Sequence, residues 1–233
     1  MGCEQQNVLF EKIPVQRSGI DFVNQITTYD TFSILTFEYI YHGGGVGIAD
    51  FNQDGLQDIF FSGNQVSSRL YLNQGDFQFE DITENAGVTT NRWATGVSIT
   101  DINQDGLPDI YVCVSGSPVA AQRANYLFVN QGNNQFEEMA AQYGIADTSY
   151  TNHAAFFDYD LDGDLDLYLI TTSNDGSARN NIREKYQQGE AENTDILYRN
   201  NGNGTFTNVS RQAGILIEGF GLGLSIADIN EDG

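Results

Sequence analysis

The chain has 233 residues, of which 40% are hydrophobic and 12% aromatic, enough to build the core of one sizeable domain or two small ones. Its 10 basic and 32 acidic residues give a net charge of −22, which opposes binding to nucleic acid and to anionic membrane surfaces. The sequence contains no apolar run of 18 residues, so we expect no membrane-spanning helix.

Residues 1–9 are expected to form a tail or a lipid-anchor region. Cys3 follows Gly2 and precedes a polar stretch, which resembles the acylated cysteine of bacterial lipoproteins, although the apolar signal segment is missing. A myristoylation signal fits less well, because Gln6 stands where Ser or Thr is required. An ordinary disordered N-terminus is the alternative. Membrane contact is therefore expected only through a lipid on Cys3, whereas Cys113, in an apolar run, is expected to be buried.

Residues 10–41 precede the first complete repeat. The segment FEKIPVQRSGI, Phe10 to Ile20, reads like a copy of the last element of each later repeat, with one extra residue between Phe10 and Gly19. It lacks preceding strands of its own, so we expect it to be an outer strand that completes the last unit of a ring. Residues 21–41 match no repeat and are expected to form a connecting strand or hairpin.

Each repeat opens with a run of eight residues that predicts a strand with close backbone packing. The runs are HGGGVGIA from His42, WATGVSIT from Trp93, YTNHAAFF from Tyr150 and FGLGLSIA from Phe220. Their first residues recur once per repeat at one end of a strand. We expect His42, Trp93, Tyr150 and Phe220 to form a partial ring that either binds a ligand by stacking or packs one unit against the next.

An acidic loop follows each of these runs, with oxygen-bearing side chains at positions 1, 3, 5 and 9, Gly at position 6 and a backbone carbonyl offered at position 7. This spacing is typical of a calcium loop. We therefore expect three complete calcium sites and one truncated site. The predicted ligands are Asp50, Asn52, Asp54, Leu56 and Asp58; Asp101, Asn103, Asp105, Leu107 and Asp109; Asp158, Asp160, Asp162, Asp164 and Asp166; and Asp228, Asn230 and Asp232.

These loops differ from EF-hands, which need a Glu at position 12 and flanking helices. Position 12 is Phe61, Val112 or Leu169, each inside a predicted strand. Such a loop coordinates the ion with its own oxygens and leaves no coordination position open for a substrate. Neutralising its carboxylates would stabilise the tight connection between strands, so calcium is expected to be structural.

A second strand, a third strand ending in Asn and Gly, and a fourth element beginning with Phe complete each unit. Four short strands per repeat predict an all-β propeller whose loops join the first and second strands of each blade. The expected blades are 42–88, 93–145 and 150–215, the last with an insertion at 173–195, followed by the start of another at 219–233. About three and a half blades cannot close a ring, so we expect an N-terminal part of a longer protein.

The loop pattern, with Phe220 and Gly221 ahead of the last loop, resembles the FG-GAP repeat of integrin alpha chains and the related VCBS repeats. The third and fourth elements resemble those of bacterial surface proteins of the ASPIC/UnbV type, relatives of cartilage acidic protein. The resemblance implies a seven- or eight-bladed calcium-binding propeller, secreted or anchored at the outer surface. His153 departs from it by replacing the usual Gly, and no ASPIC/UnbV segment is present.

Catalytic patterns are poor, and we expect no enzyme. The two histidines have no Ser or Cys partner motif, and neither a nucleophile elbow nor a phosphate-binding loop occurs. Carboxylate pairs suited to glycoside hydrolysis remain open.

The expected function is that of a calcium-stabilised cell-surface binding module for a protein or glycan, part of a larger outer-membrane-associated lipoprotein. A structural or assembly scaffold is the alternative, and a glycan-active enzyme is the third reading. Arg179, Arg183 and Lys185 mark the insertion as a candidate contact. The identity of the ligand stays open.

Overall fold

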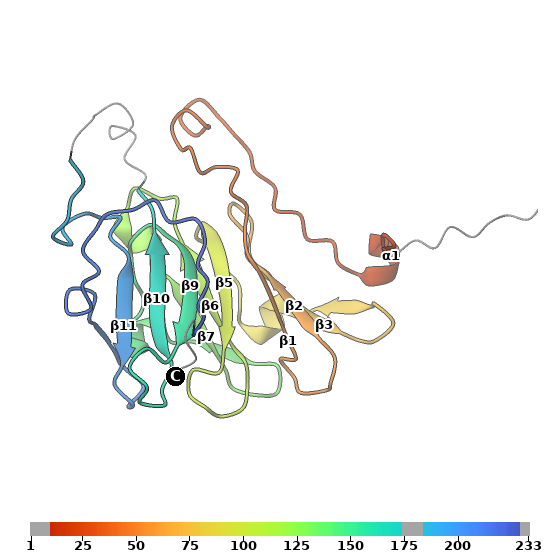
Figure 1. The fold of residues 1–233 in the computed structure, drawn as a ribbon. Helices are drawn as coiled ribbons and strands as arrows, with labels where there is room; N and C mark the ends of the chain where they lie inside the picture. The colour runs from red at the N-terminus through yellow and green to blue at the C-terminus, as the bar shows by residue number, and fades with distance from the viewer. Residues whose placement is uncertain (1–9, 174–183, 229–233) are drawn as a thin grey trace, which may run out of the picture.

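The computed structural model describes residues 10–173 and 184–228, and these residues form three four-stranded antiparallel sheets that follow one another along the chain (Figure 1). The first sheet consists of β1 (Val46–Ala49), β2 (Asp58–Phe61), β3 (Arg69–Asn73) and β4 (Phe79–Asp81). The second consists of β5 (Ala94–Thr100), β6 (Asp109–Val114), β7 (Tyr126–Asn130) and β8 (Phe136–Glu138). The third consists of β9 (Thr151–Phe157), β10 (Asp166–Thr171), β11 (Ile196–Asn200) and β12 (Phe206–Asn208). The expectation of an all-β chain with four-stranded units is confirmed.

In each sheet the strands pair in chain order, so every connection is a hairpin. The acidic loops join the first strand to the second, as the sequence predicts, and Ala49 pairs with Asp58 across the first of them. The second strands are apolar on both faces because other sheets or loops cover both sides; all six residues of β6 are buried. The three units therefore place their acidic loops at equivalent positions.

The fourth element of each unit is a short strand followed by a helical turn, rather than a strand throughout. In the first two units the turns are α2 (Thr83–Ala86) and α3 (Ala140–Tyr143), and each ends at a glycine in the left-handed conformation, Gly87 at φ 77° and Gly144 at φ 77°. Only a residue without Cβ adopts that conformation without strain, which explains the fixed spacing from Phe to Gly.

Adjacent sheets pack face to face through two apolar clusters. Val97 of β5 belongs to the cluster between the first and second sheets, and Ala154 of β9 to the cluster between the second and third. Glycines allow the inner strands to approach closely. A Cβ on Gly45 would lie 2.7 Å from the Val97 nitrogen, and one on Gly96 would lie 2.4 Å from the Asn152 oxygen. Close backbone packing of the Gly-rich strands is thus what the structure shows.

The segment 10–20 repeats the helical turn of the later units but forms no strand between Phe10 and the turn α1 (Val15–Ser18). Gly19, at φ 74°, lies against the Phe79 carbonyl of the outer strand β4. Gly87 lies in the same way against Phe136 of β8, and Gly144 against Phe206 of β12. The segment therefore occupies, on the first sheet, the place that the preceding unit occupies on the second and third.

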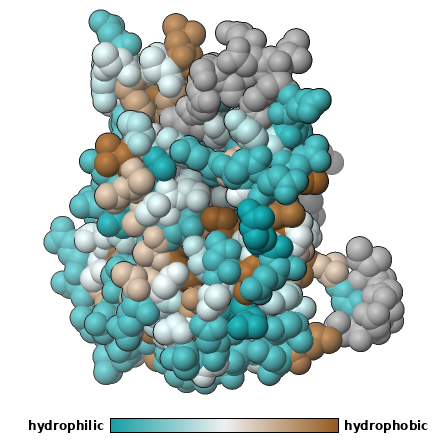
Figure 2. All heavy atoms as spheres, turned by 90° about the vertical axis from the view of Figure 1, so that its left-hand side faces the viewer, coloured by the Kyte–Doolittle hydropathy of each residue, from teal (hydrophilic) through white to brown (hydrophobic). Residues whose placement is uncertain are grey.

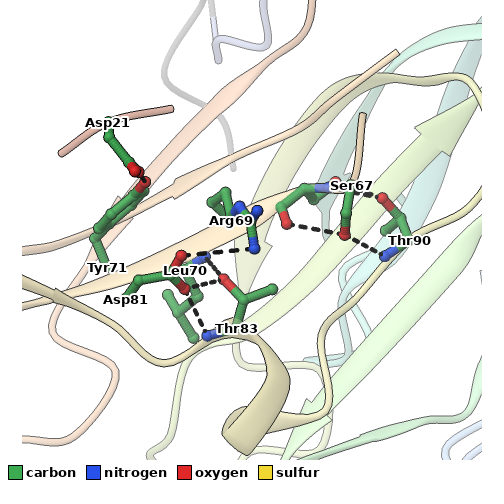
Figure 3. A network of polar contacts seen from close by, with 9 residues as sticks. Asp21, Ser67, Arg69, Leu70, Tyr71, Asp81, Thr83 and Thr90 are labelled. Carbon is green, nitrogen blue, oxygen red and sulfur yellow. Dashed lines mark hydrogen bonds and ion pairs between the residues drawn. The ribbon is translucent and has the colours of Figure 1, made fainter. Parts of the chain in front are cut away.

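A tyrosine hydroxyl fastens this segment to the first sheet (Figure 3). Tyr71 of β3 donates a hydrogen bond of 2.9 Å to Asp21, and Tyr198 of β11 donates one of 2.8 Å to Asp147, which follows α3. In Figure 3 the neighbouring Asp81 accepts hydrogen bonds from Thr83 and pairs with Arg69 at 3.6 Å. The hydrogen bonds from Thr83 thus join the start of α2 to the end of β4.

Residues 21–41 form turns and a single bridge between Tyr29 and Phe32, in place of the connecting strand or hairpin expected from the sequence. Phe22 stacks on Phe61 with ring centroids 5.2 Å apart. Phe37, which is 2% exposed, contacts Trp93 edge to face at 5.2 Å. The aromatic residues of this segment thus cover the start of the second sheet.

The last described residues, 219–228, contain no strand, whereas the sequence predicts one in the run from Phe220, because no second strand to pair with it lies among the described residues. They lie along the third sheet through a hydrogen bond of 3.0 Å from the Gly221 nitrogen to the Thr171 carbonyl. The face of the molecule over β11 is hydrophilic over most of its area (Figure 2). Among the described residues, no helix is long and apolar enough to cross a membrane.

Candidate metal centre

The three acidic loops share one backbone path, which two left-handed residues define. Gly55, Gly106 and Gly163 at position 6 have φ of 87°, 87° and 94°. Position 4 is also left-handed, although its residues carry a Cβ; the φ values are 59° for Gln53, 57° for Gln104 and 60° for Leu161. The expected turn at the glycine is therefore present. The second left-handed residue was not predictable from the sequence, because neither Gln nor Leu favours this conformation.

Backbone N–H groups of each loop point toward its own carboxylates. The position 1 aspartate accepts hydrogen bonds from positions 5 and 6, as in Asp158, which accepts from Asp162 at 3.1 Å and from Gly163 at 2.9 Å. The position 5 aspartate accepts from the nitrogen of position 7. Position 7 residues Leu56, Leu107 and Asp164 are donors here. The side chains at positions 1 and 5 are thereby gathered on the inner side of the turn.

The position 9 aspartates, Asp58, Asp109 and Asp166, are fully buried at 0% exposure. Each accepts two backbone hydrogen bonds: Asp109 accepts 2.9 Å from Ile102 at loop position 2 and 2.7 Å from Asn130 at the end of β7. The same pair of donors serves Asp58 and Asp166. These carboxylates therefore tie the loop to the third strand of its own sheet.

Burial raises the pKa of the Asp109 carboxyl to about 6, against the opposing effect of its two backbone donors; the carboxylates at positions 5 and 1 of the loop raise it further. Burial also raises the pKa of Asp58 and of Asp166. In the described part of the chain none of the three carboxylates forms an ion pair with Lys or Arg. A cation beside them would favour their charged form.

The asparagine that ends each third strand is a functional residue that the sequence reading treated only as part of a turn. Besides the backbone donation to the position 9 aspartate, the Asn130 side chain donates to the Phe51 carbonyl at 2.9 Å, in the loop of the preceding sheet, and to the Pro108 carbonyl at 3.3 Å. Asn73 and Asn200 donate to the corresponding position 8 carbonyls. Its recurrence directly before Gln-Gly or Asn-Gly was the available signal.

The third loop brings three carboxylates together. Asp158, Asp160 and Asp166 each offer an oxygen, and these oxygens all lie within 4.8 Å of one another. Such a cluster of anionic oxygens, one of them on a fully buried side chain, suits a hard divalent cation such as calcium. The donor set therefore fits the predicted ion.

The first two loops carry an amide in the corresponding place. Asn52 donates to Asp54 at 3.0 Å, and Asn103 donates to Asp105 at 2.9 Å, so each asparagine satisfies part of the position 5 carboxylate. Their amide oxygens, with Asp50 and Asp101 at position 1, remain the expected ligands. Asp228, which would open the fourth loop, is the last described residue, and Asn230 and Asp232 lie outside the described residues, as do Cys3, Arg179 and Arg183.

Neighbouring loops are joined by glutamine side chains. Gln53 of the first loop donates to the Gly106 carbonyl of the second at 2.8 Å. Gln104 of the second donates to the Gly163 carbonyl of the third at 3.1 Å and to the Asp164 carboxylate at 3.3 Å. The three loops thus form one continuous hydrogen-bonded edge.

The residues predicted to form an aromatic ring lie in different surroundings. Trp93 contacts Phe32 and Phe37, and Tyr150 is 8% exposed beneath the Arg123 guanidinium, 3.9 Å from the ring centroid. Phe220 is 58% exposed. His42 lines a cavity at the start of the inner strands, together with His153. The structure thus brings the two histidines, rather than the four ring residues, to one cavity.

Cys113 is buried, as expected, and burial raises the pKa of its thiol far above the usual range. A buried thiol that resists ionisation is a poor nucleophile. It belongs to the apolar cluster between the second and third sheets.

The family model for the FG-GAP-like repeat matches residues 50–112 and 115–169, just over half of the chain. The first matched segment begins at Asp50, the first residue of the first acidic loop. FG-GAP repeats often bind calcium, and the acidic group in the third loop lies within the second matched segment.

Curated relatives match over a longer stretch. The chain is 26% identical over 196 residues to cartilage acidic protein 1 of Xenopus tropicalis, which covers 83% of this chain and 28% of the relative. The human protein of that name is 24% identical over 196 residues, covering 83% of this chain and 27% of the relative. Integrin alpha-6 of Gallus gallus is 29% identical over 152 residues, covering 57% of this chain and 14% of the relative. The chain spans less than a third of the length of these relatives.

Proposed function

Because the chain belongs to the FG-GAP-like repeat family, we propose that it is part of a calcium-stabilised propeller that acts as a binding module at the cell surface. The observation that carries this proposal is the repeated acidic loop. Each copy gathers carboxylates on the inner side of a turn and anchors a fully buried aspartate to the third strand of its sheet.

Calcium would be held by the side chains at positions 1, 3, 5 and 9 of three loops, and by a fourth loop that begins at Asp228. The ion would supply positive charge beside carboxylates that otherwise repel one another. The chain's own residues set the shape: the left-handed glycine turns the loop, and the asparagine at the end of the third strand holds its last residue. The role is structural, because the loop lies between paired strands.

Calcium-dependent stability tests this proposal. In thermal unfolding followed by circular dichroism, removal of calcium with a chelator should lower the melting temperature, since binding to the native state alone stabilises it. Restoring calcium should reverse the change, and an equal concentration of potassium should not. An identical melting curve with and without calcium would remove the basis of the proposal.

The surface location rests on the relatives and on Cys3. Integrin alpha-6 and cartilage acidic protein 1 share the repeats, and Cys3 sits in a sequence that resembles a lipid-attachment site. We place the protein outside the cytoplasm, attached to an outer membrane through lipid when Cys3 is acylated. Mass spectrometry of Cys3 in the membrane fraction of the source cells tests this: an unmodified cysteine there excludes the anchor.

A structural scaffold is the second candidate function. It is favoured by the burial of Tyr150 and by the cover that Phe32 and Phe37 form on Trp93, because these contacts use the aromatic residues for internal packing. A glycan array and a pull-down with the full-length protein separate the two functions. Bound saccharide supports the recognition module, whereas protein partners alone, retained after His42→Gln in the cavity that this residue lines with His153, support the scaffold.

A further inference from the structure

A cavity of about 520 Å³ opens where the inner strands of the three sheets begin. Its wall contains both histidines of the chain, His42 and His153, beside Tyr41, Thr95 and Asn152. Four glycines complete most of the remaining wall: Gly43, Gly44, Gly45 and Gly96. This volume lies within the range of small-molecule sites, which run from about 300 to 1,000 Å³.

Two strand irregularities shape this wall. In β5 the pairing shifts between Ala94 and Val97, which leaves Thr95 and Gly96 outside the regular ladder. In β9 a similar shift leaves out Asn152. All three displaced residues line the cavity. Such bulges re-aim side chains and recur next to functional sites. The Thr95 carbonyl also accepts a hydrogen bond of 2.7 Å from the Gly45 nitrogen, so this bulge takes part in packing between sheets as well.

Gly96 packs against the backbone of β9 and lies beside one of the imidazoles. A Cβ at this position would meet the Asn152 carbonyl oxygen first, and would lie 3.0 Å from both the Cα and the Nδ1 atoms of His153. Glycine occupies the equivalent positions 45 and 96, where it allows the blades to pack closely, but the chain carries His at position 153. His153 therefore adds an imidazole to the cavity wall at a position where the other two inner strands carry glycine.

The polar groups of the wall can form hydrogen bonds beyond those present in the structure. Within the described part of the chain, neither imidazole ring takes part in a hydrogen bond, although the His42 ring contacts Tyr39 at 4.6 Å. The Asn152 side chain donates to the Gly221 carbonyl at 2.9 Å, which leaves its oxygen as an acceptor. The Thr95 hydroxyl donates to the Thr151 carbonyl and can still accept. These groups can serve the hydroxyl groups of a ligand.

The charge of the wall sets it apart from the rest of the molecule. The chain carries 32 acidic residues, but the described lining of this cavity contains no Asp or Glu. An imidazole N–H can donate a hydrogen bond to an anionic oxygen. An anionic group is therefore better accommodated here than beside the acidic loops. Tyr41, 64% exposed, adds an aromatic ring on which a flat apolar face can stack.

We infer that this cavity binds an acidic saccharide, with the carboxylate of a uronic acid residue between His42 and His153 and the sugar face on Tyr41. The inference rests on the proposed recognition function and gives it a site and a ligand class. A saccharide fits better than an acidic peptide, because the wall offers hydroxyl partners and one aromatic ring and, apart from Leu222, no aliphatic side chain.

Isothermal titration calorimetry with the calcium-loaded full-length protein tests the inference, with cellobiouronic acid as the probe and neutral cellobiose as its matched control. Because hydrogen bonds to a charged group are stronger than those between neutral groups, the acidic disaccharide should bind at least about tenfold more tightly than the neutral one. The double variant His42→Gln and His153→Gln should lose this preference and keep the affinity for cellobiose. Tyr41→Ala should weaken both ligands.

The control variant is Tyr29→Ala, which removes a similarly exposed tyrosine outside the cavity and should change neither affinity. Equal affinities for the two disaccharides, or full preference in the histidine double variant at an unchanged melting temperature, would overturn the inference. Tighter binding of a polyglutamate peptide, or binding of zinc ions alone through the two imidazoles, would also overturn it. If calcium stabilises the protein and a ligand binds regardless of all cavity variants, the proposed function stands and this site falls.

Discussion

The first two acidic loops and the third follow the same backbone path, but the third differs at positions 3, 4 and 7, where the first two are identical. Position 3 is Asn52 or Asn103 in the first two loops and Asp160 in the third. The amides donate to the position 5 carboxylate, whereas Asp160 adds a carboxylate to the cluster with Asp158 and Asp166. Position 4 changes from Gln to Leu161, and position 7 from Leu to Asp164.

This comparison separates the residues that determine the conformation of a loop from those that determine its affinity for calcium. The shape depends on features common to all three copies: the left-handed glycine, the buried position 9 aspartate and its backbone donors. The charge at position 3 varies without changing the fold. Because ligand charge is one of the main determinants of calcium affinity, we expect the third loop to bind calcium more tightly and to depend on it more.

The largest expected effect comes from the shared feature. Asp109→Ala should lower the free energy of unfolding by about 3 kcal/mol or more, since it leaves the buried N–H groups of Ile102 and Asn130 without an acceptor. Urea denaturation at saturating calcium measures the change. Asp105→Ala, at an exposed position of the same loop, is the matched control and should cost much less. Equal losses would show that the buried aspartate has no special role.

The charge difference is tested by exchanging position 3. Asp160→Asn should weaken calcium binding to the third loop by about tenfold, and Asn103→Asp should strengthen binding to the second, because each change alters the number of anionic ligands by one. Isothermal calcium titration, with hydrogen exchange to assign each loop, measures both. Unchanged affinities in the two variants would contradict the idea that the charge at position 3 sets the difference in calcium affinity between the loops.

Backbone conformation should have a smaller effect, similar in all loops. Gly163→Ala should destabilise the protein by about 1 kcal/mol, because φ is 94° and no atom lies within 4 Å of the added Cβ, so the cost is conformational. Leu161→Gly, also at positive φ, should offset part of its entropic penalty by relieving strain. Thermal unfolding measures both. If Gly163→Ala stabilised the protein instead, the positive φ at this position would not disfavour a side chain.

The smallest expected effect concerns the links between loops. Gln104→Ala removes the hydrogen bonds from the second loop to the third and should cost about 0.5–1 kcal/mol while lowering the cooperativity of calcium binding. Gln104→Glu is a useful companion, since it keeps the length and adds repulsion with Asp164. A titration with an unchanged Hill coefficient in both variants would mean that the loops bind independently.

Sequence reasoning located the repeated units, the strand order and the loops, because each leaves a periodic mark: alternating apolar strands, a Gly at position 6 and an Asp at position 9. It also anticipated that the Gly-rich strands pack closely. It treated Asn73, Asn130 and Asn200 as turn residues, since asparagine is equally common in turns and the hydrogen bonds from these side chains to the acidic loops have no local sequence signal.

Residues 10–41 could be predicted from the sequence only in part. The likeness of residues 10–20 to an outer element was visible, and the contact of Gly19 with β4 agrees with it. The path of residues 21–41 was not predictable, because it depends on aromatic contacts with Trp93 and Phe61 that have no local periodicity. The pairing of His42 with His153 in one cavity likewise depends on how separate sheets meet.

The glycine contacts between consecutive units bear on how the chain acquires its structure during synthesis. Gly19, Gly87 and Gly144 each join a helical turn to the outer strand of the next sheet to be made. A sheet emerging from the ribosome therefore finds its docking surface already translated, beginning with the short turn α1. Proteins built from contacts between neighbouring repeats can add units one at a time. Assembly in the direction of translation would keep each newly made strand edge exposed only briefly.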